Sequence, residues 1–209
     1  LVWASYMTLR DQPLGEYVEG EHYVLAEQPR RVKGDKAEVV EFFSYGCIHC
    51  YNFDPGLEDW VQAQGDGVVF QRIPLVGSDY WRMLGRAYYT MQALNLGARE
   101  HHAMFREIHD KQNILNSPDK LETFFADFGV AGEDFQSAFN SAEVARQVAR
   151  ADQLGRRFKI AAVPTMVIQG KYVIATAEAV GFKRMIDVMD YLLEKERGGV
   201  DAGAAGSSR

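Results

Sequence analysis

The most constraining feature of this chain is a run of strand-forming residues that leads directly into a pair of cysteines. Residues 38–44 form the stretch EVVEFFS, in which Glu41 is the one acid inside an apolar run. Such a run predicts a strand covered on both faces. A short connection then brings the chain to Cys47, where a helical pattern begins, and Cys50 follows one turn later. The sequence therefore places both of its cysteines at the start of one helix.

The composition limits what the rest of the chain can be. Hydrophobic residues make up 47% and aromatic residues 12% of the 209 positions, enough for a core without disulfide staples. The net charge of -6 argues against a nucleic-acid partner, because phosphate binding needs clustered Lys and Arg. No run of apolar residues approaches the roughly 18 that would cross a bilayer.

The hydrophobic pattern predicts strands at both ends of the chain and helices in the middle. The predicted strands are residues 17–25, 38–44, 68–75, 163–169 and 172–175. The predicted helices begin at Cys47, Tyr80, near Met104, at Ser117-Pro118, near Phe135, at Ser141 and at Phe182. This order indicates an α/β sheet domain interrupted by a block of helices.

The same pattern gives expected domain boundaries. The sheet domain is expected to be discontinuous and to comprise residues 16–76 and 141–197, with an all-helical insertion at 77–140. Residues 198–209, GGVDAGAAGSSR, are small and polar, and this composition predicts a disordered tail.

The spacing of the cysteines allows three interpretations: a redox pair, half of a zinc site, or two incidental thiols. A structural zinc site usually needs four ligands, and no second CxxC is present. The remaining candidates are His101, His102 and His109, no two of which are four residues apart, and these are interpreted as surface or inter-helix residues. A redox pair without any metal is therefore the favoured interpretation.

The position of the cysteines gives each a separate role. At a helix start, free N–H groups and the helix dipole favour an anion, and His49 can add a positive charge or a hydrogen bond. Both effects lower the pKa of Cys47 and make it the nucleophile, while Cys50 is expected to be the buried, resolving thiol. A stabilised thiolate favours the reduced protein and makes the disulfide more oxidising. Ile48 and His49 are the residues that tune this potential.

The stretches EFFSYGCIHCYNF and AVPTMVIQG resemble the DsbA family, thioredoxin-fold thiol oxidases of the bacterial periplasm. The resemblance extends from about Glu16 to Lys195. It implies a thioredoxin fold with an inserted all-helical domain. Cys47 matches the nucleophilic cysteine of the family and Cys50 the resolving cysteine.

The resemblance also implies roles for residues outside the cysteine pair. Glu41 matches the buried acid, which is expected to exchange protons with Cys50. Val163-Pro164 matches the cis-proline loop, which faces the cysteines, keeps metal ligands away and leaves the Val163 backbone free to pair with an extended substrate. The familiar dipeptide between the cysteines is Pro-His, and this chain departs from it with Ile48.

The expected function is that of an oxidant, which donates the Cys47–Cys50 disulfide to reduced, unfolded exported proteins through a mixed disulfide at Cys47. No cofactor is expected, and the resemblance implies reoxidation by a DsbB-like membrane quinone reductase. A periplasmic monomer is expected. Because the chain starts at Leu1, a signal peptide or lipid anchor is expected to have been removed. The alternatives are a reductase or isomerase on the same fold, and a peptide-binding chaperone with incidental cysteines.

Overall fold

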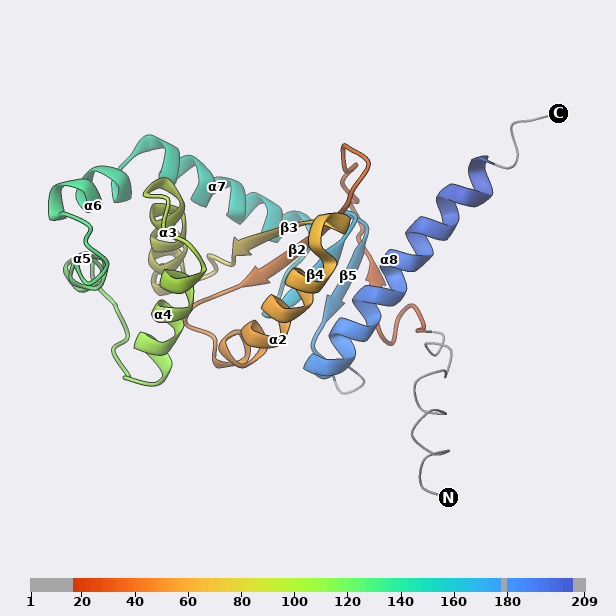
Figure 1. The fold of residues 1–209 in the computed structure, drawn as a ribbon, viewed down its shortest axis with the longest axis horizontal. Coiled ribbons are helices and arrows are strands. Elements are labelled where there is room, and N and C mark those ends of the chain that lie inside the picture. Colours follow the sequence, from red (N-terminus) through yellow and green to blue (C-terminus); the bar gives the residue numbers. More distant parts are fainter. Residues whose placement is uncertain (1–16, 178–179, 205–209) are drawn as a thin grey trace, which may run out of the picture.

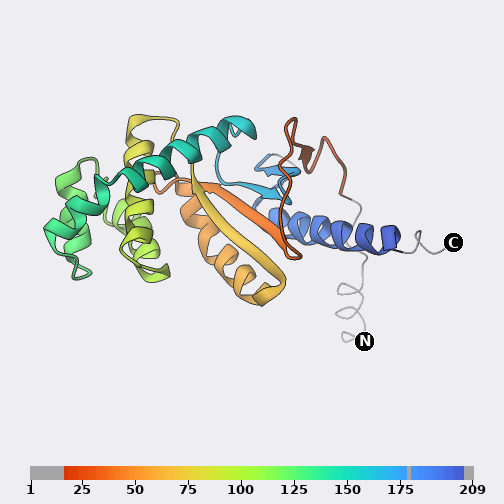
Figure 2. The same ribbon diagram turned by 90° about the horizontal axis from the view of Figure 1, so that it is seen from above.

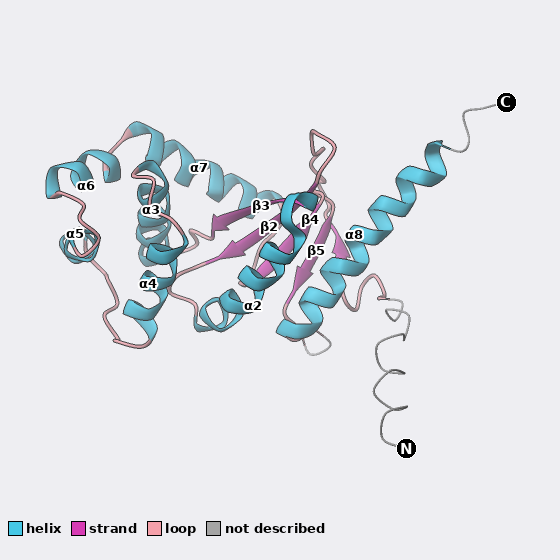
Figure 3. Cartoon of the chain, viewed as in Figure 1, coloured by secondary structure: helices cyan, strands magenta, loops and turns pink. Residues whose placement is uncertain are grey.

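A computed structural model describes residues 17–177 and 180–204, and of residues 199–204 it describes the backbone alone. A mixed five-stranded sheet runs through its centre in the order β1-β5-β4-β2-β3 (Figure 3). The strands are β1 (Val24–Leu25), β2 (Ala37–Phe43), β3 (Val68–Pro74), β4 (Thr165–Ile168) and β5 (Tyr172–Ala175). The central strand β2 is parallel to β3 and antiparallel to β4.

The helices cover both faces of this sheet and extend beyond one end of it. They are α2 (Ile48–Gln64), α3 (Asp79–Ala93), α4 (Ala98–His109), α5 (Pro118–Ala126), α6 (Gly132–Phe139), α7 (Ala142–Arg157) and α8 (Phe182–Ala204). Helices α2 and α8 lie on one face and α7 on the other (Figures 1 and 2). Helices α3 to α6 gather beside β3, so the predicted α/β sheet with an all-helical insertion is confirmed.

Two buried clusters hold the layers together. One joins Val40 and Phe42 of β2 to Phe105 of α4, so the core of the insertion is continuous with one face of the sheet. The other joins Val39 to Leu57 of α2 and to the apolar side of α8. Val39 and Val40 are successive residues of β2 that enter different clusters, and this explains why the strand is apolar on both faces.

Serine caps mark several helix starts. The side chain of Ser117 accepts the Lys120 N–H, and Pro118 follows at the first helical position, where its missing N–H costs nothing. Ser141 caps α7 in the same way by accepting the Val144 N–H. Both predicted helix starts are confirmed.

The first strand is much shorter than predicted. A strand over 17–25 is wrong, because Gly20 has a φ of 87° and its N–H bonds to the Tyr23 carbonyl, which closes a turn. Only Val24 and Leu25 remain to pair with β5. An extended strand cannot pass through a residue in this left-handed region.

The end of the chain also differs from the prediction. A disordered tail from residue 198 is wrong up to Ala204, because α8 continues to that residue. Extending an existing helix needs no new nucleus, so α8 continues although three of the seven residues in 198–204 are glycines. Residues 205–209 of the predicted tail and Glu16, where the predicted sheet domain begins, lie outside the described residues. In the described ranges, no helix is both long and apolar enough to cross a membrane.

Candidate active site

The two cysteines lie where the central strand meets the first helix of the sheet domain. Cys47 has extended backbone angles and caps α2, so the helix begins at Ile48 rather than at Cys47 itself. The Cys47 N–H bonds to the Ser44 carbonyl at 3.0 Å, and its own carbonyl accepts the Tyr51 N–H at 3.1 Å. The Cys47 side chain therefore lies at the positive end of the helix dipole.

The two thiols, which the structure holds as free cysteines, differ in exposure and in proton affinity. Cys47 is half-buried, and its pKa is lowered to about 6, first by a hydrogen bond from the Cys50 thiol and then by the backbone N–H groups of Cys50 and His49 and the His49 charge. Cys50 is completely buried, and burial raises its pKa strongly, with Cys47 and Glu41 adding to the effect. The thiolate therefore resides on Cys47.

The residues between the cysteines both face outward. Ile48 is a large apolar side chain with 47% of its surface exposed. The ring of His49 is also exposed and lies 6.0 Å from the ring of Phe182 at the start of α8. The tuning residues named from the sequence are therefore beside Cys47 and accessible to a partner.

The loop before β4 faces the cysteine pair from the other side. The Val163–Pro164 peptide bond is cis. The Val163 carbonyl lies 3.4 Å from Cys47 Sγ, within reach of a hydrogen bond from the thiol form. The structure thus brings together two residues that are 116 positions apart.

Glu41 lies beneath the active-site helix, in the middle of β2. Its carboxyl is only 1% exposed and accepts a 2.9 Å hydrogen bond from Arg72 Nε, its register neighbour on β3. Burial raises the pKa of Glu41 to about 7, although the Arg72 charge opposes the rise. At neutral pH Glu41 therefore populates both its protonated and its ionised form.

Several known proteins are similar to this chain in sequence and in fold. Residues 81–192 match a family model described as a DSBA-like thioredoxin domain. The thiol:disulfide interchange protein DsbA of Pseudomonas aeruginosa is 35% identical over 183 residues, which cover 87% of each chain. The corresponding protein of Azotobacter vinelandii is 34% identical over 87% of this chain and 83% of the relative. The chain belongs to the DsbA family.

Solved structures agree with this assignment. The crystal structure of Pseudomonas aeruginosa DsbA superposes with a TM-score of 0.84 at 34% identity and covers 89% of this chain and 97% of that one. The oxidoreductase DsbA from Xylella fastidiosa gives a TM-score of 0.81 at 33% identity, over 87% of this chain and 98% of that one. The DsbA-like thioredoxin fold with a helical insertion is confirmed, and the chain is a thiol:disulfide interchange protein.

Below the thiols of this DsbA-family protein lies a charge cluster that sequence reasoning missed. Arg72 donates to Glu41, to Asp54 at 3.0 Å and to Glu58 at 2.6 Å. Asp54 and Glu58 follow Cys50 at intervals of four residues, so all three lie on one side of α2. That spacing, together with an arginine inside an apolar strand next to Glu41, is the signal that could have revealed the cluster.

The histidines of α4 are inter-helix residues, and each has a partner in or before α2. His101 and His102 both bond to Asp54. His109 Nε2 lies 2.8 Å from the Tyr45 carbonyl, in the loop before Cys47. Among the residues that the structure describes, no group of three or more His, Cys, Asp or Glu side chains is arranged to hold a metal ion.

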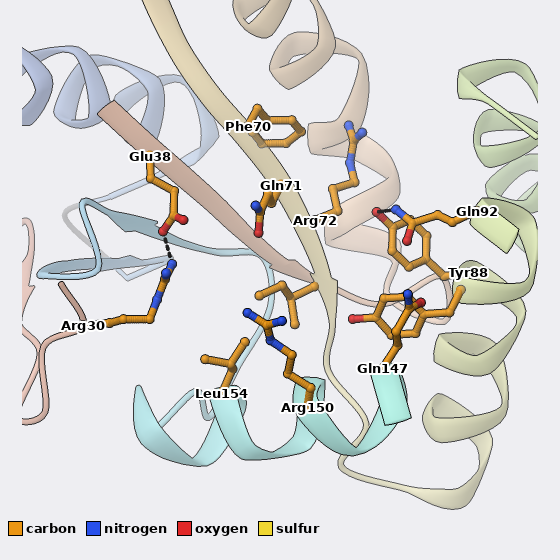
Figure 4. A pocket seen from close by; sticks show the side chains of 12 residues that line it. Arg30, Glu38, Phe70, Gln71, Arg72, Tyr88, Gln92, Gln147, Arg150 and Leu154 are labelled. Atoms are coloured by element: carbon orange, nitrogen blue, oxygen red, sulfur yellow. Dashed lines mark hydrogen bonds and ion pairs between the residues drawn. The ribbon is translucent and has the colours of Figure 1, made fainter. Parts of the chain in front are cut away.

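A groove of about 510 Å³ lies apart from the thiols, between β3, α3 and α7 (Figure 4). It contains an Arg30–Glu38 ion pair and a Tyr88–Gln92 hydrogen bond. Neither cysteine lines it. In this DsbA-family protein the redox chemistry therefore belongs to the exposed end of α2 and not to this groove.

Proposed function

We propose that this DsbA-family oxidoreductase works as an oxidant and donates the Cys47–Cys50 disulfide to reduced, unfolded proteins. The observation that carries the proposal is the opposite direction of the two thiol pKa shifts, down to about 6 for Cys47 and upward for Cys50. A thiolate at Cys47 stabilises the reduced protein relative to its disulfide. Whatever stabilises the reduced protein makes its disulfide a stronger oxidant.

The reaction runs through two thiol–disulfide exchanges. A substrate thiolate attacks Cys47 Sγ, the Cys47–Cys50 bond breaks, and Cys50 leaves as a thiolate that must take up a proton. In this proposal Glu41 supplies the proton, which its pKa of about 7 supports. A second substrate thiolate then attacks the substrate sulfur of the mixed disulfide, and Cys47 leaves as a stable thiolate. The substrate gains one disulfide, and this protein ends with two reduced cysteines.

Substrate contacts in this proposal come from both sides of Cys47. The Val163 backbone pairs with an extended segment of the substrate, in the manner of an added strand. Exposed Ile48 offers apolar contact without sequence preference, which suits unfolded chains. The Val163 carbonyl near Cys47 Sγ supports this arrangement.

The cellular setting of the proposal follows from family membership. We place the protein in the periplasm as a monomer, with a DsbB-like membrane quinone reductase as the oxidant that restores the disulfide. The disulfide itself is the redox group, and no further cofactor or metal takes part. Ile48 replaces the proline of the familiar motif, so we expect the contact with the membrane partner to differ at this residue.

The decisive experiment is a redox titration in glutathione buffers, with the Cys47–Cys50 disulfide quantified by thiol trapping and mass spectrometry between pH 5 and pH 8. We expect a potential well above that of the glutathione pool. Because the Cys47 pKa is about 6, the potential should fall by about 59 mV per pH unit below that pH and by about 30 mV above it. A potential near that of thioredoxin would make the protein a reductant.

Two variants separate the alternatives. Cys50→Ala should accumulate a mixed disulfide at Cys47, whereas Cys47→Ala should abolish oxidation of a reduced substrate. If the protein were a chaperone with incidental cysteines, the Cys47→Ala variant would suppress aggregation as well as the original protein does. An isomerase would rearrange a scrambled substrate faster than it oxidises a reduced one.

A further inference from the structure

Helix α4 reaches the charge cluster through two adjacent histidines. His102 Nδ1 lies 2.8 Å from Asp54 Oδ2, and His101 Nε2 lies 3.2 Å from Asp54 Oδ1. Burial opposes ionisation of Asp54, but the interactions with His101, Arg72 and His102 outweigh it and lower the Asp54 pKa. Since an ionised carboxylate only accepts hydrogen bonds, both histidines must donate to it.

The tautomer of His101 follows from the same bonds. Burial lowers the pKa of His101, so the ring is neutral and carries one N–H, which points from Nε2 to Asp54. Its Nδ1 must then accept the Tyr45 hydroxyl proton, at 2.7 Å. Tyr45 itself is 1% exposed and precedes Cys47 by two residues. His101 therefore ties α4 to both α2 and the loop that carries the nucleophile.

Arg72 divides one positive charge among three carboxylates. Its guanidinium donates to Glu41, Asp54 and Glu58. The Arg72 N–H that bonds to Asp54 does not bond to Glu41, so it stabilises the Glu41 carboxylate less. The negative charge of Asp54 also raises the Glu41 pKa. Asp54 also accepts hydrogen bonds from His101 and His102 of α4, and these weaken its interaction with Arg72.

Other groups also act on Glu41. The titratable residues that interact with it include Tyr45, Cys50, Asp54, Glu58, Arg72 and Tyr88. Burial raises the pKa of Tyr88 to about 12, so its hydroxyl stays protonated and supplies no charge near neutral pH. Of the two histidines of α4, His102 bonds to Asp54 alone among the described residues, so its influence on Glu41 passes through Asp54. His101 also interacts with Arg72, Glu58 and Tyr45.

We propose that His101 and His102 are positioning residues of the redox reaction, which hold Asp54 and thereby set how firmly Arg72 stabilises the Glu41 carboxylate. The proposal rests on the proposed function, in which Glu41 exchanges protons with Cys50. It gives the helical insertion a part in the proton chemistry of the cysteine pair. The insertion would then do more than shape a surface around the thiols.

The proposal makes predictions of opposite sign. Asp54→Asn removes a negative charge next to Glu41 and frees Arg72, so the Glu41 pKa should fall by about one unit. His102→Leu removes one donor from Asp54, which then draws more on Arg72, so the Glu41 pKa should rise by about half a unit. In the double variant Asp54→Asn/His102→Leu, the His102 substitution should no longer change the Glu41 pKa, because the carboxylate that links His102 to Arg72 is absent.

The direct measurement is a carbon-13 carboxyl NMR titration of the reduced protein, with the Glu41 signal assigned by its loss in Glu41→Gln. His102→Asn is the rescue variant, because its amide nitrogen occupies the place of Nδ1 and can still donate to Asp54. His109→Leu is the matched control on the same helix, since His109 bonds to the Tyr45 carbonyl and not to Asp54. Both should leave the Glu41 pKa within about 0.2 units of its original value.

Several outcomes would overturn the proposal. Shifts of the same sign in Asp54→Asn and His102→Leu would indicate loosened packing, as would an equal shift in His109→Leu or additive effects in the double variant. If Asp54→Asn does not fold, Glu58→Gln serves in its place, because the Glu58 charge also raises the Glu41 pKa. The titration does not depend on oxidase activity, so a reducing potential would refute the proposed function and leave this inference to be decided separately.

Discussion

At the scale of single residues, Glu41 is a carboxyl that the fold keeps partly protonated at neutral pH. Burial raises its pKa from 4.5 to about 7, so the folded protein prefers the protonated form. The stabilisation from this preference is fully present below pH 4.5 and is lost as the pH rises through 7. The loss amounts to about 3 kcal/mol of the free energy of unfolding.

Glu41→Gln should remove this pH dependence. Relative to the original protein, the variant should gain about 3 kcal/mol between pH 4.5 and pH 8, because its amide has no proton to lose. Urea unfolding of the reduced proteins at both pH values measures the change, with exposed Glu133→Gln as the control. A stability difference that stays constant across this range would contradict the raised pKa.

Gly46, like Tyr45 before it, lies where the loop before Cys47 contacts the insertion. A Cβ on Gly46 would lie 2.9 Å from Trp81 Nε1 and 3.1 Å from Tyr80 Cε1, so the Trp81 ring would have to move. Gly46→Ala should therefore destabilise the protein by about 1–3 kcal/mol and change its tryptophan fluorescence.

Gly77→Ala provides the matched control for this substitution, because a Cβ on Gly77 meets no atom within 4 Å. Its stability and emission should stay close to those of the original protein. Equal stability and equal emission spectra for the two alanine variants would show that the loop before Cys47 is loosely packed.

At the scale of elements, the cap of α7 makes a measurable contribution. The Ser141 side chain accepts the Val144 N–H at 3.1 Å, a group with no partner inside the helix. Ser141→Ala should cost about 1 kcal/mol of unfolding free energy, measured in urea. Ser137→Ala, an exposed change within α6, should be neutral, and a similar loss in both variants would argue against the cap.

Local patterns predicted several elements because the relevant chemistry is local. The strand 172–175 has the predicted bounds, and the caps at Ser117 and Ser141 depend on residues one turn away. The strand predicted for 163–169 is shorter, because Pro164 precedes the first paired residue and offers no N–H for the ladder. The predicted strand 17–25 failed at a single glycine turn.

The candidate site divides in the same way. The position of Cys47 at a helix start could be predicted from the residues around it. The bond between Asp54 and His101 joins positions 47 residues apart, and no periodicity in either helix indicates it. Such contacts depend on how the insertion packs against the sheet domain, which hydrophobic patterning leaves open.

At the scale of the whole molecule, the continuous core predicts that the insertion and the sheet domain unfold together. Trp60 lies in α2 and Trp81 in α3, so each reports on a different part. In variants that keep only one of these tryptophans, with the other and Trp3 changed to Phe, the urea midpoints should coincide. An earlier transition at Trp81 would show that the insertion unfolds by itself.

The long separation between Cys47 and the loop that faces it has a consequence for synthesis. A chain made from its N-terminus presents both cysteines well before Val163, which follows Cys47 by 116 residues. The cysteines are only three residues apart and can meet within one turn of helix, whereas the Val163 carbonyl is synthesised much later. During that interval the chain is itself an unfolded protein with two accessible thiols, which is the class of substrate that the proposed function assigns to it.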